Sequence, residues 1–93
     1  MIQTFKDKGT ERIFNREVSK KLPPDIQRVA LRKLLWIHGA RILAELNVPP
    51  LNRLEKLKGS RKGQHSIRIN DQWRICFKWD NGNAFDVEIA DYH

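Results

Sequence analysis

The dipeptide Asn81-Gly82 constrains the fold of this chain more than any other feature, because it separates two strand-like runs. "WRICFKW" (73–79) is rich in aromatic and β-branched residues, and "AFDVEIA" (84–90) alternates apolar with polar positions. Asn-Gly is the strongest short-range signal for a two-residue β-hairpin, since both of its residues accept positive φ. The sequence therefore predicts that these two runs pair as an antiparallel hairpin.

Further strands are predicted before this hairpin. "QHSIRI" (64–69) alternates in the same way and runs into the turn residues Asn70-Asp71. "RLEKL" (53–57) is typical of a short strand, and "MIQTF" (1–5) alternates well enough to be another. Together these runs indicate a small sheet that occupies most of the second half of the chain.

Two helices are predicted between the first strand and the others. "TERIFNREV" (10–18) begins with Thr10, a candidate cap, and Asp25 is placed to cap the longest helical pattern, 26–46. This order of elements predicts an α+β fold, in which two N-terminal helices pack on one face of a small antiparallel or mixed sheet. With 93 residues the chain is predicted to form a single domain, 1–93.

Composition narrows the classes of partner. The formal net charge is +7 and the isoelectric point is about 10, values that favour binding to polyanions such as nucleic acid. No apolar run is long enough to cross a bilayer, and the first residues lack the apolar block of a signal peptide. We therefore expect a cytoplasmic protein with no membrane partner. A lone cysteine and three widely separated histidines predict neither a disulfide nor a metal site.

Basic residues concentrate in one segment of the chain. Between Leu51 and Trp79 they are opposed only by Glu55 and Asp71, and they are Arg53, Lys56, Lys58, Arg61, Lys62, Arg68, Arg74 and Lys78. If the Asn70-Asp71 turn pairs their strands, Arg68 and Arg74 share a face, beside Lys56 or Lys58. Taken singly, each cation is most simply a solvated surface residue. Gathered on a sheet face that no helix covers, they would concentrate a phosphate backbone.

Arg74 differs from the other cations because it lies within the most hydrophobic run of the chain. A charge in a central strand is costly unless it is paired or reaches the surface. Arginine suits a phosphate, because its planar guanidinium contacts two oxygens at once and stays charged.

The pattern "LKGSRKGQHSIRINDQWRI", with "DYH" after the last strand, resembles the HigB branch of the RelE/ParE toxin superfamily. The resemblance extends over essentially the whole chain and is strongest from Asn52 to His93. It implies a RelE-like microbial RNase fold and a type II toxin, which enters the ribosomal A site and cuts the mRNA there. It also implies a cognate helix-turn-helix antitoxin, HigA-like, through which alone the complex would contact operator DNA.

The resemblance assigns roles to individual residues. It implies phosphate and transition-state contacts from Lys58 and Arg74, and a functional role for Asp91, Tyr92 and His93. Glu55 is a departure, because a HigB-type site can carry a histidine there. The set of Glu55, Arg74 and His93 resembles the YoeB-like branch instead. Among the basic segment and the end of the last strand, we expect RNA contacts from Arg53, Lys56, Arg61, Lys62, His65, Arg68 and Asp91.

These residue types suit RNA cleavage without metal or cofactor, in which the ribose 2′-OH attacks the adjacent phosphorus. Glu55 is the candidate base, and Arg74 with Lys58 would stabilise the charge on phosphorus. His93 is the candidate acid, since its reference pKa of about 6.5 allows both protonation states near neutrality. Tyr92 would stack on a base or donate its hydroxyl. The expected products are a 2′,3′-cyclic phosphate and a 5′-hydroxyl.

Two other functions remain open at this point. One is a ParE-like toxin that binds DNA gyrase and cuts nothing, since a fold does not fix a function. The acid–base residues Glu55 and His93 argue against it. The other is an RNA-binding relative with little catalytic activity, suggested by the unusual Glu55. Trp73 and Trp79 are expected to pack in the core, whereas Trp36 is a candidate antitoxin contact.

Overall fold

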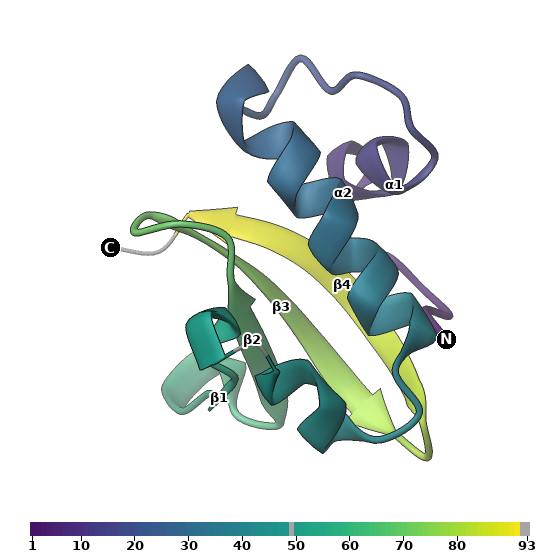
Figure 1. The fold of residues 1–93 in the computed structure, drawn as a ribbon, viewed down its shortest axis with the longest axis vertical. Coiled ribbons are helices and arrows are strands. Elements are labelled where there is room, and N and C mark those ends of the chain that lie inside the picture. The colour runs from purple at the N-terminus through teal and green to yellow at the C-terminus, as the bar shows by residue number, and fades with distance from the viewer. Residues whose placement is uncertain (49, 92–93) are drawn as a thin grey trace.

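Two helices lie across one face of a four-stranded sheet, as Figure 1 shows. This computed structural model describes residues 1–48 and 50–91. The elements follow in this order: α1 (Lys8–Phe14), α2 (Pro24–Gly39), β1 (Glu55–Lys56), β2 (Gln64–Arg68), β3 (Trp73–Asp80) and β4 (Asn83–Asp91), with the short 3₁₀ turns η1 (Leu43–Asn47), η2 (Pro50–Asn52) and η3 (Gly59–Arg61). The predicted α+β class, with both helices on one face of the sheet, is confirmed.

The sheet is an antiparallel meander in the order β1-β2-β3-β4. The predicted hairpin joins β3 to β4, and Asn81 and Gly82 both have positive φ, 49° and 80°. Positive φ at both central residues is the geometry of a type I′ turn, whose twist matches that of the strands. The second predicted hairpin is also present, because Ile67 pairs with Ile75 across the turn at 70–71.

The core lies between the sheet and the two helices. Alternate residues of β3, Ile75 and Phe77, are fully buried on the helix side. They meet the apolar stripe of α2, where Ala30, Leu34 and Ile37 are also fully buried. Trp73 and Trp79 pack against this core, as predicted. The opposite face of the sheet carries no helix, and a second, smaller cluster of buried residues lies there, formed by Leu57, Cys76 and Ala90.

The second helix is shorter than predicted and ends at Gly39 rather than at residue 46. Ala40 adopts an extended conformation, with φ −69° and ψ 135°. The Glu45 carboxylate then accepts the backbone N–H groups of Arg41 and Ile42, at 2.7 and 3.1 Å. These groups would otherwise extend the helix, so the side chain of Glu45 competes with helical hydrogen bonding. The backbone hydrogen bond from Arg41, followed by that from Ile42, lowers the pKa of this carboxyl.

Both predicted helix caps are wrong. Asp7, not Thr10, caps α1, and its carboxylate accepts the Thr10 N–H at 2.7 Å. The helix α2 already starts at Pro24, after an N-cap residue, Pro23, that makes no side-chain hydrogen bond, so Asp25 lies within its first turn. Proline is favoured at the first helical position, because its missing N–H would have no partner there.

The first five residues do not form the predicted strand; they contact β4 through two isolated β-bridges. Ile2 and Phe5 pair in parallel with Ala84 and Val87 of β4. Between these bridges the β4 backbone bulges, and Asp86 takes a φ of 52°. The Asp86 N–H therefore donates to the side-chain hydroxyl of Thr4, at 2.8 Å, and not to a backbone carbonyl. The bulge prevents a continuous ladder along this edge of β4.

The side chain of Thr10 links α1 to β4 by a hydrogen bond. The residue is fully buried, and its hydroxyl oxygen accepts the backbone N–H of Ile89 at 2.9 Å. We expect Thr10→Val to lower the free energy of unfolding by about 2 kcal/mol, because the buried amide loses its acceptor. Denaturant unfolding measures this change. Thr10→Ser keeps the hydroxyl and should cost clearly less, so equal losses in the two variants would contradict the role of the hydrogen bond.

No helix in the part of the chain that the structure describes could span a membrane.

Candidate active site

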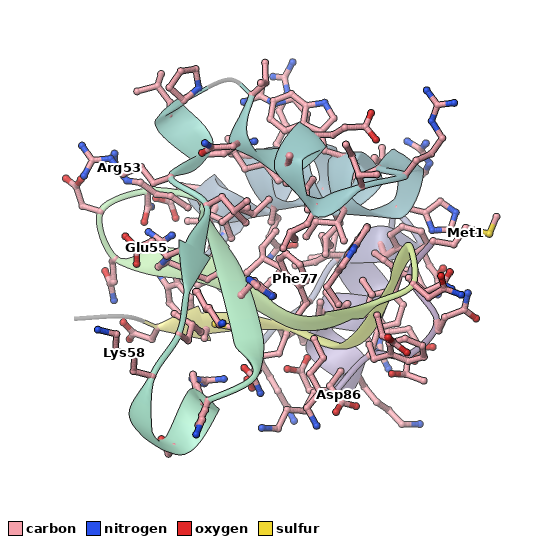
Figure 2. All side chains as sticks on the ribbon, turned by 90° about the horizontal axis from the view of Figure 1, so that it is seen from below. Met1, Arg53, Glu55, Lys58, Phe77 and Asp86 are labelled. Atoms are coloured by element: carbon pink, nitrogen blue, oxygen red, sulfur yellow. The ribbon has the colours of Figure 1, made fainter. Side chains whose placement is uncertain are left out.

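Three of the residues predicted for the site, Glu55, Arg68 and Arg74, lie on the sheet face that no helix covers. Cα partners across antiparallel strands project their side chains to the same face. Arg74 of β3 is opposite Arg68 of β2 and Ala90 of β4, and Ser66 is opposite both Cys76 and Glu55. The register therefore places Arg74 in the middle of this face and Glu55 at its β1 side. In Figure 2, Glu55 and Lys58 lie on the same side of the molecule, while Phe77 lies inside the core.

Arg74 is held rigidly in this face. The residue is only 7% exposed. Its Nε donates to the Ser66 hydroxyl at 2.7 Å, and one Nη donates to the Arg53 backbone carbonyl at 2.5 Å. The same Nη lies 3.9 Å from a carboxylate oxygen of Glu55. A buried guanidinium needs such partners, because a charge removed from water without them is strongly destabilising. The contacts fix both the position and the orientation of the cation.

The backbone at Arg53 is turned so that its carbonyl faces Arg74. Arg53 has a φ of 45°, in the left-handed region that is unfavourable for a residue with a side chain. Its own side chain is exposed and projects outward in Figure 2. The Arg53 side chain, which was predicted to contact RNA, therefore lies at the rim of the candidate site, and the Arg53 carbonyl holds Arg74 in place. Backbone strain of this kind is concentrated at functional sites.

Glu55 and Lys58 lie on the β1 side of Arg74, close to solvent. The side chain of Glu55 is 52% exposed, so it is accessible to a substrate. Lys58 borders a pocket of about 310 Å³, whose other lining residues are Lys56, Leu57, Gly59 and Lys62. Both Lys56 and Lys62 were predicted RNA contacts. The structure therefore brings three exposed lysines to one hollow beside the Glu55 strand.

Arg61 is engaged inside the protein. Its Nη1 donates to the Glu88 carboxylate at 2.7 Å and to the Gln64 side chain at 3.2 Å. Glu88 also lies 3.8 Å from the Lys6 ammonium. The ion pair with Glu88 connects the loop that carries Lys58 to β4, two strands away. The sequence predicted that Arg61 contacts RNA. It could not reveal the ion pair, because Glu88 is 27 residues further along the chain.

Two other predicted RNA contacts have different surroundings. Arg68 shares the Arg74 face, forms an ion pair with Asp71, and accepts a hydrogen bond from Lys33 on its carbonyl. His65 is opposite Phe77, with ring centroids 6.1 Å apart, and so belongs to the helix side of the sheet. Burial, with a smaller effect of Lys56, lowers the pKa of His65 and favours its neutral form. The structure does not bring His65 to Arg74.

The end of β4 lies beside this site. Asp91 is opposite Trp73, so its side chain shares the face of Trp73 and not that of Arg74, and it accepts a hydrogen bond from Gln72 at 3.2 Å. The other two residues predicted from the ending "DYH", Tyr92 and His93, lie outside the described residues. Their roles as stacking group and acid remain predictions.

Sequence reasoning missed three supports of the site: the Ser66 hydroxyl, the Arg53 carbonyl and the Glu88 carboxylate. A signal for Ser66 was present, since it stands two residues before Arg68 and so projects to the same face. A backbone carbonyl leaves no trace in the sequence. Cys76 is also on this face, but it is buried, and burial raises the pKa of its thiol, which favours the less reactive protonated form.

The arrangement suits chemistry at a phosphate. A fixed guanidinium and an accessible carboxylate 3.9 Å away share one face of the sheet, and a hollow lined by lysines lies beside the strand that carries this carboxylate. Among the described residues, no group of three or more His, Cys, Asp or Glu side chains is placed to hold a metal ion.

Known proteins resemble this chain over nearly its whole length. Residues 3–93 match the family model of the RelE-like toxin of the type II toxin–antitoxin system HigB. The chain is 38% identical to toxin HigB-1 of Vibrio cholerae over 90 residues, covering 96% of this chain and 95% of that one. It is also 38% identical to endoribonuclease HigB of Proteus vulgaris over 94 residues, with both chains fully covered.

Solved structures show the same fold. YafQ of E. coli superposes with a TM-score of 0.59 at 11% identity, covering 98% of this chain and 91% of that one. A Staphylococcus aureus YoeB–YefM complex superposes with a TM-score of 0.58 at 20% identity, covering 100% and 95% of the two chains. At these identities the likeness concerns the fold alone.

Proposed function

The chain belongs to the HigB-like family of RelE-like toxins of type II toxin–antitoxin systems, and we propose that it is an endoribonuclease that cuts mRNA in the ribosomal A site. The observation that carries this proposal is Arg74, a nearly buried guanidinium fixed by Ser66 and the Arg53 carbonyl, with Glu55 beside it. A protein that only bound a partner would have no need of a fixed cation next to an accessible carboxylate.

Arg74 would act on the transition state. When the ribose 2′-OH attacks, negative charge grows on the nonbridging oxygens of the phosphate. A donor that is already oriented stabilises this charge without reorganising, and in many enzymes such stabilisation contributes most of the rate enhancement. The supports of Arg74 supply this orientation. Lys58, at the nearby hollow, would add a second positive charge.

Glu55 would act as the base that removes the 2′-OH proton. It is partly exposed, so a ribose can reach it. His93 would protonate the departing 5′ oxygen, with Asp91 orienting the imidazole or contacting a base edge and Tyr92 stacking on a base. The products would be a 2′,3′-cyclic phosphate and a 5′-hydroxyl, formed without metal or cofactor.

We expect Glu55→Gln to reduce cleavage of translated mRNA by about 100-fold, because the amide cannot accept the proton. Single-turnover cleavage on programmed ribosomes measures the loss. Glu17→Gln is the matched control: it makes the same carboxylate-to-amide change at an exposed residue between α1 and α2 and should change the rate far less. If Glu55→Gln cleaved at the wild-type rate, Glu55 would not be the base.

A primer-extension assay tests the whole proposal. Translated mRNA incubated with the protein should show cuts at A-site codons, and the same mRNA without ribosomes should show none. Absence of cuts in both samples would reject the nuclease function. Inhibition of DNA gyrase under those conditions would point instead to a ParE-like toxin.

The partner of a type II toxin is a protein antitoxin, and we propose a HigA-like helix-turn-helix protein for this chain. Operator DNA would be contacted only through it. The target on translating ribosomes implies action in the cytoplasm.

A further inference from the structure

The loop between β1 and β2 folds back over the sheet face that no helix covers. It spans residues 57–64, and we call it the lysine loop. Leu57, at its start, is 5% exposed and forms the small buried cluster with Cys76 of β3 and Ala90 of β4. The Leu57 N–H donates to the Gln64 carbonyl at 2.9 Å. Both ends of the loop are therefore held at the sheet, and its first side chain packs on the two strands beyond β2.

One ion pair joins the middle of the lysine loop to β4. Nη1 of Arg61 donates to the Glu88 carboxylate at 2.7 Å and to the Gln64 side chain at 3.2 Å. The side chains of Arg61 and Glu88 are 30% and 18% exposed, so water shields the pair only in part. Partly buried ion pairs are screened less by salt than exposed ones, and their hydrogen bonds are stronger than neutral ones. The pair thus fastens the loop to a strand that does not pair with β2.

Two glycines flank the turn η3 inside the lysine loop. Gly59 and Gly63 have φ values of 65° and 91°, in the region that glycine adopts freely. A Cβ at either position would meet nothing within 4 Å, so the requirement is conformational and not steric. Segments that reorient as a unit often have such small residues at their hinges. The side-chain contacts of Leu57 and Arg61 therefore select this position of the loop.

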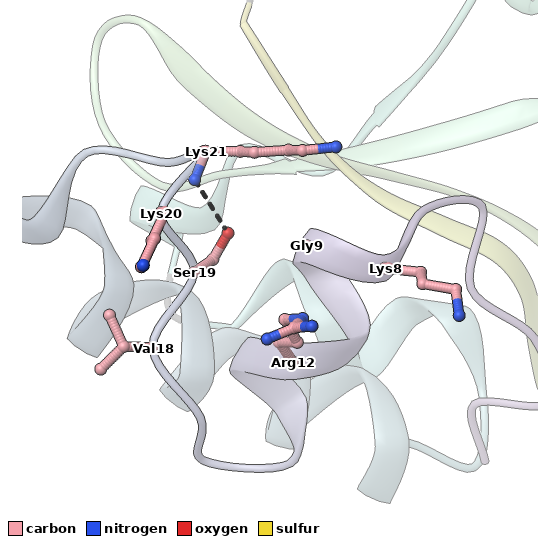
Figure 3. A pocket seen from close by; sticks show the side chains of 7 residues that line it. All are labelled: Lys8, Gly9, Arg12, Val18, Ser19, Lys20 and Lys21. Carbon is pink, nitrogen blue, oxygen red and sulfur yellow. Dashed lines mark hydrogen bonds between the residues drawn. The ribbon is translucent and has the colours of Figure 1, made fainter.

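A second basic hollow is built differently. It lies between α1 and the connection 15–23, has a volume of about 430 Å³, and is drawn in Figure 3. Its wall is braced locally, since the Lys21 N–H donates at 3.3 Å to the hydroxyl of Ser19, two residues earlier. The hollow that Lys58 borders depends instead on Glu88, which is 27 residues beyond Arg61. A single substitution in β4 can therefore displace the wall that carries Lys58.

We propose that Glu88 is a positioning residue for RNA cleavage: through Arg61 it clamps the lysine loop on the sheet and so fixes Lys58 beside the scissile phosphate. This inference rests on the proposed function, in which Lys58 adds positive charge at the phosphate. A charge that is already in place stabilises the transition state without reorganising. A loop that moved would lose part of this stabilisation, although every group of the site was still present.

The single cysteine of the chain reports the position of the loop. Cys76 is 1% exposed in the cluster with Leu57, so a thiol reagent reaches it only when the loop opens or the domain unfolds. We expect Glu88→Gln to speed Cys76 labelling about fivefold and to slow single-turnover cleavage on programmed ribosomes by a similar factor, because charge-assisted hydrogen bonds are roughly twice as strong as neutral ones. Labelling at several pH values separates loop opening from a change in the pKa of the thiol.

Two variants serve as controls. Asp86→Asn makes the same change two residues earlier in β4, where the carboxylate pairs with Lys78 at 3.3 Å, and should alter neither rate. Asparagine tolerates the φ of 52° at this position. Thr10→Val weakens the whole fold without touching the lysine loop. It should leave Cys76 labelling unchanged, because the thiol is reached by local opening. An equal rise in Thr10→Val and Glu88→Gln would show that only unfolding exposes the thiol, and would overturn the clamp.

Lys58→Met tests whether the effect passes through Lys58. Cleavage by this variant should already be slow, and adding Glu88→Gln should slow it little further, since the two changes are then not independent. A full additional loss in the double variant would overturn the inference. So would unchanged labelling of Glu88→Gln, or faster labelling with cleavage at the wild-type rate. Failure of the proposed function is separate, because absent cleavage by the wild type would leave the labelling results unaffected.

Discussion

Replacing Arg74 with lysine is expected to lower the rate of ribosome-dependent mRNA cleavage by at least about 100-fold, although the positive charge is kept. The guanidinium contacts the Ser66 hydroxyl through Nε and the Arg53 carbonyl through Nη, and no single ammonium reproduces that geometry. A lysine would also replace the delocalised guanidinium with a compact point charge. Single-turnover cleavage on programmed ribosomes measures the effect.

The comparison that isolates this geometry uses Lys78→Gln. Lys78 lies four residues further along β3, on the same face, and pairs with Asp86 at the molecular edge. Removing its charge entirely should change the rate by no more than about threefold, since an exposed ion pair contributes little. Arg74→Lys will also lose some stability, so cleavage must be compared where both variants are folded. A folded Arg74→Lys protein with wild-type activity would rule out orientation as the function of this residue.

Deleting Tyr92 and His93 is expected to reduce cleavage by a factor of about 100 to 10,000, the range typical of a missing general acid. The sheet that the structure describes ends at Asp91, which pairs with Trp73 and remains in the shortened chain. Folding and antitoxin binding should therefore be unchanged. Cleavage, thermal unfolding and antitoxin titration on the same preparation measure the three properties.

Two single substitutions separate the residues removed by this deletion. His93→Gln should reproduce most of the loss in rate, whereas Tyr92→Phe keeps the ring and should retain activity if stacking is its role. A deletion variant that also fails to bind the antitoxin would show that the end of the chain is structural. Undiminished cleavage by His93→Gln would reject the acid assignment.

Local sequence signals predicted the sheet well. Asn81-Gly82 and Asn70-Asp71 both lie in turns that join antiparallel strands, and the predicted pairing of Arg68 with Arg74 on one face is confirmed. Such pairings follow from strand alternation and turn chemistry, which act over a few residues.

These local signals do not predict contacts between segments that are far apart in the sequence. The ion pair of Arg61 with Glu88 and the hydrogen bond from Arg74 to the Arg53 carbonyl depend on how separate elements meet. The helix end at Gly39 was missed for a related reason, because the side chain of Glu45 captures backbone groups that a helix would have used. Helical spacing continues past Gly39 in the sequence, so periodicity alone overestimates the length.

The attachment of the first residues to β4 has a consequence for synthesis. Ile2 and Phe5 bridge to β4, and Thr10 binds its Ile89 amide, so the earliest part of the chain must wait for residues 83–91 before it can dock. The strand β3, which carries Arg74, likewise gains its second neighbour only then. Domains generally fold as units as they leave the ribosome. This one acquires its complete sheet only after β4 has been translated, so the strand that carries Arg74 gains both of its neighbours late in synthesis.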